Sequence, residues 1–158
     1  MKRINIDSSQ QRLELIVDGL VVRSYIVSTA SNGMGEANGS FQTPRGRHQV
    51  CAKIGHLLDP LAVLVARRPT GEIYSSQMAE KERHRDWILG RILWLSGLEK
   101  GQNLGGNVDT RKRYIYIHGS PPSASYGEPG SRGCIRMRPT DIVNLFESIE
   151  VGAEVYIS

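Results

Sequence analysis

The chain has 158 residues, of which 39% are hydrophobic and 23% charged, and its 20 Lys and Arg outnumber its 16 Asp and Glu to give a net charge of +4. This composition is typical of globular proteins and excludes collagen-like, coiled-coil and disordered chains, while the length predicts that residues 1–158 form a single domain. No apolar run reaches the roughly 18 residues that a membrane-spanning helix needs, so no membrane span is expected.

The amino-terminal residues and the cysteines indicate a reducing compartment. Lys2 and Arg3 are followed by a stretch over 5–12 in which Ile6 is the one apolar residue, where a secretory signal peptide would need an apolar stretch. The sequence therefore predicts a cytoplasmic protein. In that compartment we expect Cys51 and Cys134 to be free thiols rather than partners in a disulfide.

The first third of the chain has the pattern of β-strands separated by turns. Arg12–Val17 and Leu20–Ser28 are rich in apolar and β-branched residues, and they flank Asp18-Gly19, a dipeptide favoured in two-residue hairpin turns. A loop rich in glycine and asparagine follows over 31–46, and Arg47–Ile54 resumes strand character. These features predict a hairpin, a loop and a third strand.

The middle of the chain has the spacing of a helix. Apolar side chains recur over Ala79–Leu95 and charges cluster at its start, which predicts an amphipathic helix of about three or four turns that ends at Gly97. Trp87 and Trp94 would lie on this helix and pack in the core, the alternative being that one of them lines a substrate cleft. Residues 102–110 are rich in glycine and asparagine and predict a loop.

A strand and a long loop come next. Tyr114–His118 alternates aromatic residues with isoleucine, as a buried strand does, and this would place His118 on the same face as Tyr114 and Tyr116. Prolines and glycines over 119–133 predict a loop after this strand.

The chain then ends in a helix and a strand. Arg138–Asp141 has the composition of a helix start, with Thr140 or Asp141 as the capping residue, and the apolar pattern continues through 146–149. Val155–Ile157 predicts a closing strand. The fold class is therefore mainly β, with one or two packed helices.

Cys134 and His118 form a pattern typical of nucleophilic catalysis. A thiol with an ordinary pKa of about 8.5 is mostly unreactive at neutral pH, and a nearby imidazole or guanidinium lowers that pKa. Arg132 and Arg136 both lie within two residues of Cys134, so we expect its pKa to be lowered. Gly133 lacks a Cβ and permits a tight turn that aims backbone N–H groups at a developing oxyanion. Composition alone explains Cys134 equally well as a small buried residue and His118 as a core histidine.

The segments Ile117-His118-Gly119 and Ser131-Arg132-Gly133-Cys134-Ile135-Arg136 resemble the catalytic signature of the L,D-transpeptidase (YkuD) family. In that signature a His-Gly pair is followed, after a loop, by Ser-His-Gly-Cys-hydrophobic-Arg. The early hairpin, the turn over 43–46 and the C-terminal strand also fall where the family has them, so the resemblance covers essentially the whole chain. It implies a YkuD-type, β-sandwich-like catalytic domain.

The resemblance also implies a role for each matching residue. Cys134 would be the nucleophile and His118 the general base, Gly119 would orient the imidazole through its carbonyl, and Arg136 would support the site. The sulfur should then lie within about 4 Å of one ring nitrogen of His118, with the other ring nitrogen facing the carbonyl of Gly119 or a neighbour.

Arg132 departs from the family pattern, which usually has histidine at this position. A guanidinium cannot act as an acid or base at neutral pH, and it presents a forked donor suited to carboxylates. We therefore expect Arg132 to bind a substrate carboxylate, the alternative being a solvated surface charge. The other candidate substrate-binding residues are Arg136, Ser131, Gly133 and Tyr116.

The charge distribution favours an anionic partner. Residues 111–138 contain six Arg and Lys but only one acidic residue, Glu128, which suits the carboxylates of a muropeptide or peptidoglycan stem peptide. No nucleic-acid-binding motif accompanies these residues, so no nucleic acid is expected. His48, Cys51 and His56 lack the spacing of a zinc site, and we expect no metal or other cofactor. The sequence does not indicate an oligomeric state.

In the family that the sequence resembles, two activities share this catalytic apparatus. In both, Cys134 would attack the carbonyl of the third residue of a tetrapeptide stem and expel the terminal D-Ala, leaving a thioester acyl-enzyme. Water would then make the enzyme an L,D-carboxypeptidase, and an amine from a second stem would make it an L,D-transpeptidase. Without an export signal, the sequence favours a cytoplasmic L,D-carboxypeptidase in peptidoglycan recycling over a transpeptidase that forms cross-links. An inactive stem-peptide-binding module is a further alternative.

Overall fold

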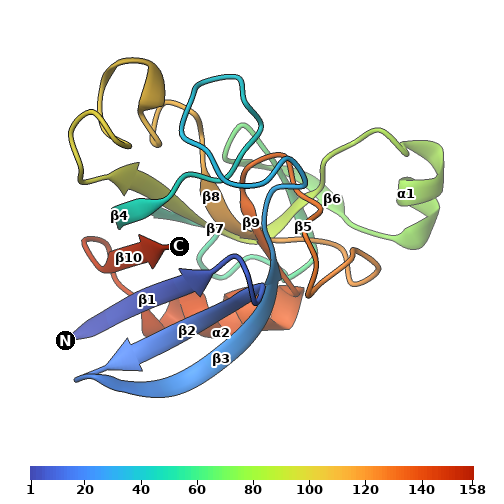
Figure 1. Ribbon diagram of the computed structural model, residues 1–158. Coiled ribbons are helices and arrows are strands. Elements are labelled where there is room, and N and C mark those ends of the chain that lie inside the picture. Colours follow the sequence, from blue (N-terminus) through green and yellow to red (C-terminus); the bar gives the residue numbers. More distant parts are fainter.

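The computed structural model describes residues 1–158 and is mainly β, with two α-helices, as predicted. Ten strands form one sheet in the order β4-β10-β1-β2-β3-β9-β8-β7-β5-β6, and β4 also pairs with β7. This second pairing closes the sheet on itself and leaves the β5–β6 hairpin attached outside the closure (Figure 1). In chain order the elements are β1 Lys2–Asp7, β2 Arg12–Val17, β3 Leu20–Ser28, β4 Gly46–Ile54, β5 Ala62–Val65, β6 Arg68–Ile73, α1 Ser76–Lys81, β7 Ile88–Gly97, β8 Tyr116–Gly119, β9 Ile135–Met137, α2 Pro139–Ser148 and β10 Glu154–Ile157, with a 3₁₀ turn at Gly106–Val108.

The strands predicted in the first third of the chain are confirmed. β2 and β3 have the predicted bounds, and Asp18 and Gly19 turn between them with φ angles of 49° and 81°, the left-handed values that a two-residue hairpin needs. β4 matches the third predicted strand to within one residue. β1 was not predicted, because only Ile4 and Ile6 alternate with polar residues there. It pairs antiparallel with β2 and parallel with β10.

The main core lies inside the closed sheet and contains 19 buried apolar residues. Most come from alternate strand positions, because successive side chains of a strand point to opposite faces. α2 adds Ile142, Leu145 and Phe146 to this core. Lys53 of β4 donates to the carbonyls of Phe146 and Ile149 at 2.6 and 2.7 Å, which ties the end of α2 to the sheet.

The start of α2 differs from the prediction. Arg138 is the N-cap residue, without a side-chain cap bond, and Pro139 takes the first helical position, so the prediction of Thr140 or Asp141 as cap is wrong. Proline starts a helix without such a cap, because its φ is already close to the helical value and it has no N–H to satisfy.

The predicted helix over Ala79–Leu95 is also wrong. α1 spans only Ser76–Lys81 and buries no residue, while Ile88–Gly97 forms β7, which pairs with β4, β5 and β8. Nearly every residue of β7 is buried. A strand covered on both faces forms a continuous apolar run, which periodicity alone does not distinguish from a buried helix. The β5–β6 hairpin was likewise not predicted.

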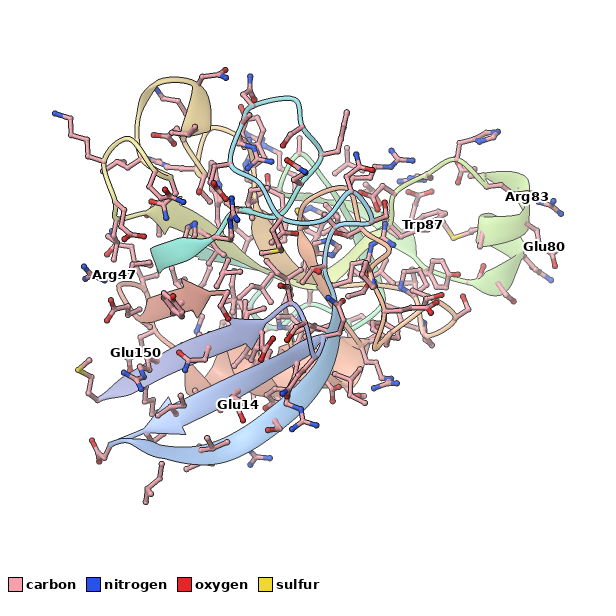
Figure 2. All side chains as sticks on the ribbon, viewed as in Figure 1. Glu14, Arg47, Glu80, Arg83, Trp87 and Glu150 are labelled. Carbon is pink, nitrogen blue, oxygen red and sulfur yellow. The ribbon has the colours of Figure 1, made fainter.

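α1 stands out from the body of the protein between β6 and β7 (Figure 1). Glu80 of α1 and Arg83 of the turn that follows it are exposed, and Trp87 lies nearer the sheet (Figure 2). Trp87 packs edge-on against Tyr74 at 5.2 Å in a small satellite cluster, so it is buried but outside the main core. Neither helix has the length and apolar character needed to cross a membrane.

Candidate active site

The parallel pairing of β8 with β9 brings the predicted catalytic residues to one face of the sheet. His118 is paired with Arg136, and Ile117 with Ile135. Because strand side chains alternate between faces, the two isoleucines enter the main core, and His118 and Arg136 point to the opposite side. Cys134 lies two residues before Arg136 and therefore shares the face of His118.

The loop that presents Cys134 is held by hydroxyl groups. Gly133 has a φ of 129°, and a Cβ on it would approach the Ile115 side chain at 3.2 Å and the Gln42 carbonyl at 3.3 Å, so glycine is required there. The Ser131 hydroxyl accepts a bond from the Gly133 N–H at 3.1 Å and donates to the Cys134 carbonyl. Thr43 donates to the Gly133 carbonyl at 2.8 Å. Ser131 and Gly133 thus shape the loop, with a partner in Thr43 that sequence reasoning missed.

The backbone N–H of Cys134 is unpaired. The Gly133 N–H before it bonds to the Ser131 hydroxyl, whereas the Cys134 N–H donates to no protein acceptor. A free N–H on the nucleophile itself is the kind of donor that stabilises an oxyanion formed at the attacked carbonyl.

Burial dominates the chemistry of the Cys134 thiol. Its sulfur accepts from the Tyr116 N–H at 3.3 Å and donates to the Tyr114 carbonyl at 3.4 Å. Although the side chain keeps some contact with solvent, the protein around the sulfur raises the pKa of Cys134 to about 12, and the charges of Arg136 and Arg113 offset this only in part. The expectation of a lowered pKa is therefore wrong, because desolvation of the thiolate outweighs its basic neighbours. Both cysteines are free, as predicted.

His118 is buried and has one ring nitrogen engaged. Its side chain is 1% exposed, and Nδ1 lies 2.7 Å from the carbonyl of Gly119, the contact expected from the sequence. A carbonyl only accepts, so Nδ1 carries the proton and Nε2 of the neutral ring is an acceptor. Nε2 makes no hydrogen bond within the protein. Burial lowers the pKa of His118, which keeps the ring neutral.

The two arginines of the motif behave differently. Arg136 donates to the Gly130 carbonyl at 2.9 Å and pairs with Asp86 at 2.8 Å, so it links the nucleophile loop to the segment before β7. Arg132 is exposed and makes no hydrogen bond or ion pair. Arg113, which sequence reasoning did not single out, is partly buried and donates to the Gln42 carbonyl at 2.6 Å.

Aromatic side chains lie beside the thiol. Trp94 of β7 contacts Tyr116 edge-on at 5.8 Å and Tyr114 at 5.9 Å. Tyr114 reaches this side from a turn, with a φ of 56°, because β8 begins only at Tyr116, two residues later than predicted. The Tyr116 hydroxyl accepts from Arg67 Nη1 at 2.9 Å. Nothing in the local sequence pointed to Arg67, which belongs to the hairpin that was not predicted.

Comparisons with known proteins agree with the motif. The family model of the L,D-transpeptidase catalytic domain, YkuD, matches residues 1–157. The putative L,D-transpeptidase YkuD of Bacillus subtilis (strain 168) is 31% identical over 101 residues, which are 63% of this chain and 51% of that protein.

Solved structures show the same fold. An L,D-transpeptidase from Mycobacterium smegmatis superposes with a TM-score of 0.57 at 21% identity, covering 99% of this chain and 58% of that one. An L,D-transpeptidase from Xylanimonas cellulosilytica gives 0.58 at 22% identity, covering 99% and 60%. The chain thus spans about half to three fifths of the length of these proteins.

Proposed function

The chain belongs to the L,D-transpeptidase (YkuD) catalytic-domain family, and on that premise we propose that it is a cysteine-dependent acyltransferase acting on peptidoglycan stem peptides, built as one catalytic domain. The observation that carries the proposal is the placement of Cys134, with its free N–H, on the same sheet face as His118, whose Nε2 is free. A nucleophile, a base and an oxyanion donor are the groups that acyl transfer needs.

The resting pair is a neutral thiol and a neutral imidazole. With a pKa of about 12, almost no Cys134 is ionised at neutral pH, so attack requires proton removal in the same step. His118 Nε2 accepts that proton once the thiol leaves the Tyr114 carbonyl. The Nδ1–H bond to Gly119 fixes the tautomer and stabilises the imidazolium.

The first chemical step forms a thioester. The Cys134 sulfur adds to the carbonyl of the third stem residue, and the Cys134 N–H stabilises the resulting oxyanion. When the carbonyl re-forms, the bond to the terminal D-Ala nitrogen breaks, and His118 returns its proton to that leaving amine. The products of this step are free D-Ala and an acyl-enzyme on Cys134.

The second step transfers the acyl group to an amine. The family and the Bacillus relative carry the name of a transpeptidase, and this supports transfer to the side-chain amine of a second stem. His118 would take the proton of the attacking amine and give it to the departing thiolate. Water in place of the amine would yield a tripeptide, which is the carboxypeptidase activity in recycling that the sequence favoured.

Mass spectrometry of the protein incubated with a tetrapeptide stem tests the proposal. We expect D-Ala release, a thioester adduct on Cys134 and a cross-linked dimer in the presence of a second stem. Accumulation of the tripeptide alone would assign the carboxypeptidase activity instead. Neither D-Ala release nor an adduct would overturn the proposal and favour an inactive binding module.

A further inference from the structure

The β5–β6 turn places an arginine in an unfavourable backbone conformation. The two turn residues are Ala66 and Arg67, with φ angles of 49° and 63°. Such turns favour glycine and asparagine, because a Cβ makes the left-handed region costly. Residues held in the left-handed backbone region cluster at functional sites, so a function of the Arg67 side chain is expected.

The Arg67 guanidinium is held over a floor of aromatic rings. Its carbon lies 4.8 Å from the centre of the Trp94 ring and 5.0 Å from that of Tyr114, and Nη1 donates to the Tyr116 hydroxyl. Arg111 also stacks on Trp94, at 5.3 Å. The tyrosines of this floor touch the nucleophile directly, since the Tyr116 N–H and the Tyr114 carbonyl both bond the Cys134 sulfur.

Arg67 has no anionic partner within the protein. Several other arginines are neutralised by carboxylates, namely Arg45, Arg47, Arg85 and Arg136. Arg67 makes one side-chain hydrogen bond, to the neutral Tyr116 hydroxyl, and is partly exposed. A guanidinium fixed in place with unused N–H groups is ready to take a carboxylate in a two-pronged bond.

We propose that Arg67 binds a carboxylate of the stem peptide that donates the acyl group, an assignment that rests on the proposed function. The Tyr116 side chain separates the guanidinium from the sulfur, so the bound carboxylate would lie about one side chain away from the reacting carbonyl. Two carboxylates of the donor have this chemistry: the one on the terminal D-Ala and the one on the side chain of a diaminopimelate in the third position. Arg67 would thereby select the donor and fix its register over Cys134.

The test compares variants that keep the turn intact. Arg67→Gly removes the guanidinium and suits the φ of 63°, so it should fold. Loss of a charge-assisted bond should raise KM for D-Ala release about ten- to a hundredfold, with kcat little changed. Arg67→Lys should recover part of this loss. Arg68→Ala is the matched control, because Arg68 is the next residue, is exposed and makes no side-chain hydrogen bond or ion pair.

Substrates with one carboxylate amidated identify the group that Arg67 holds. When the carboxylate that Arg67 binds is amidated, the KM of the unsubstituted protein should rise by the factor expected for Arg67→Gly. Arg67→Gly should then raise KM for this amidated stem no further. The other amidated stem should keep the full effect of the variant. An unchanged KM in Arg67→Gly would overturn the assignment. So would a full KM increase from Arg67→Gly on top of the increase from amidation for both amidated stems.

Binding to the Cys134→Ala protein separates this proposal from the proposed function. Calorimetry of the tetrapeptide stem with Cys134→Ala should show binding, and adding Arg67→Gly should weaken it about ten- to a hundredfold. If the unsubstituted protein releases no D-Ala but this difference remains, the subsite stands and the acyl-transfer proposal falls. Equal binding with and without Arg67, or no binding at all, overturns the subsite whatever the activity.

Discussion

The protein contains two pairs of a buried histidine and a free cysteine, and only one of the pairs has the features of an active site. His48 and Cys51 belong to β4, whereas His118 lies in β8 and Cys134 directly precedes β9. Burial lowers the pKa of both histidines and raises the pKa of both cysteines. Residue type, burial and direction of the pKa shift are therefore the same in the two regions.

The hydrogen bonds distinguish them. His48 uses both ring nitrogens, one toward the Gly46 carbonyl and one toward the Thr110 hydroxyl, each at 2.9 Å. His118 uses only Nδ1, so Nε2 is available to take a proton. The free Nε2 supports the proposal that His118 is the general base, whereas His48, with both ring nitrogens bonded, holds Gly46 and Thr110 in place.

Replacing the cysteines should give the largest contrast. Cys134→Ala removes the proposed nucleophile and should abolish D-Ala release from a tetrapeptide stem, because the other thiol, Cys51, lies on β4, which β7 separates from the His118 strand β8. Cys51→Ala should leave the rate nearly unchanged. Mass spectrometry of the released amino acid measures both, and substantial turnover by Cys134→Ala would break the comparison.

The histidines should separate catalysis from stability. His118→Ala should lower kcat by about 10²–10⁴, the usual loss when a general base is removed. His48→Ala leaves the Thr110 hydroxyl without its partner and should lower the free energy of unfolding by about 1–3 kcal/mol instead. Steady-state kinetics and urea unfolding of both proteins check this, and a kcat in His118→Ala close to that of the parent would contradict it.

The reactivity of Cys134 toward iodoacetamide should follow its raised pKa. With a pKa of about 12 instead of 9.0, the thiolate fraction at pH 7 falls about a thousandfold, so alkylation should be slow and rise steadily with pH through the alkaline range. The Cys51→Ala protein isolates this thiol for the measurement. An alkylation rate that levels off below pH 8 would show a resting thiolate–imidazolium pair. The pKa of Cys134 would then not be raised as that of Cys51 is.

His48 should also make stability depend on pH. Burial lowers its pKa from 6.5 to about 4, so the unfolded chain takes up the proton first as the pH falls. Stability is then lost between about pH 6.5 and pH 4, by on the order of 3 kcal/mol in total. Urea unfolding at pH 7.5 and pH 4.5 should show a smaller loss in His48→Gln than in the parent, because His118 contributes equally to both. Equal losses would mean that His48 is not held neutral.

Sequence reasoning succeeded where local pattern decides the structure. The hairpin of β2 and β3 follows from alternation around Asp18-Gly19. The motif pointed to His118 and Cys134, but the parallel pairing of β8 with β9 that brings their segments together was not predicted. It failed for β7, because burial on both faces arises from neighbours that lie far away in the chain. The direction of the Cys134 pKa shift was missed for the same reason, since basic residues are visible in a sequence and desolvation is not.

The residues added by the structure were missed because topology, not spacing, brings them to the site. Thr43 bonds Gly133 from a segment far from Cys134 in sequence, and Arg113 bonds the Gln42 carbonyl, which lies beside Gly133. Arg67 comes from a hairpin whose turn carries no glycine or asparagine, the usual signal for such a turn. These residues come close to the Cys134 segment only when the sheet is folded and closed.

The smallest effect is expected at Arg132, where the chain departs from the family motif. It flanks the nucleophile as Arg136 does, but Arg136 is tied to Gly130 and Asp86, whereas Arg132 is exposed and unpaired. A bond from an exposed guanidinium to a substrate carboxylate is worth about 0–1 kcal/mol, so Arg132→Ala should raise KM by no more than about fivefold. Arg132→His restores the residue of the family motif, and near pH 8 its neutral imidazole should recover little of that loss. A tenfold or larger rise in KM for Arg132→Ala, with kcat unchanged, would instead make Arg132 the main carboxylate ligand and reduce the share left to Arg67.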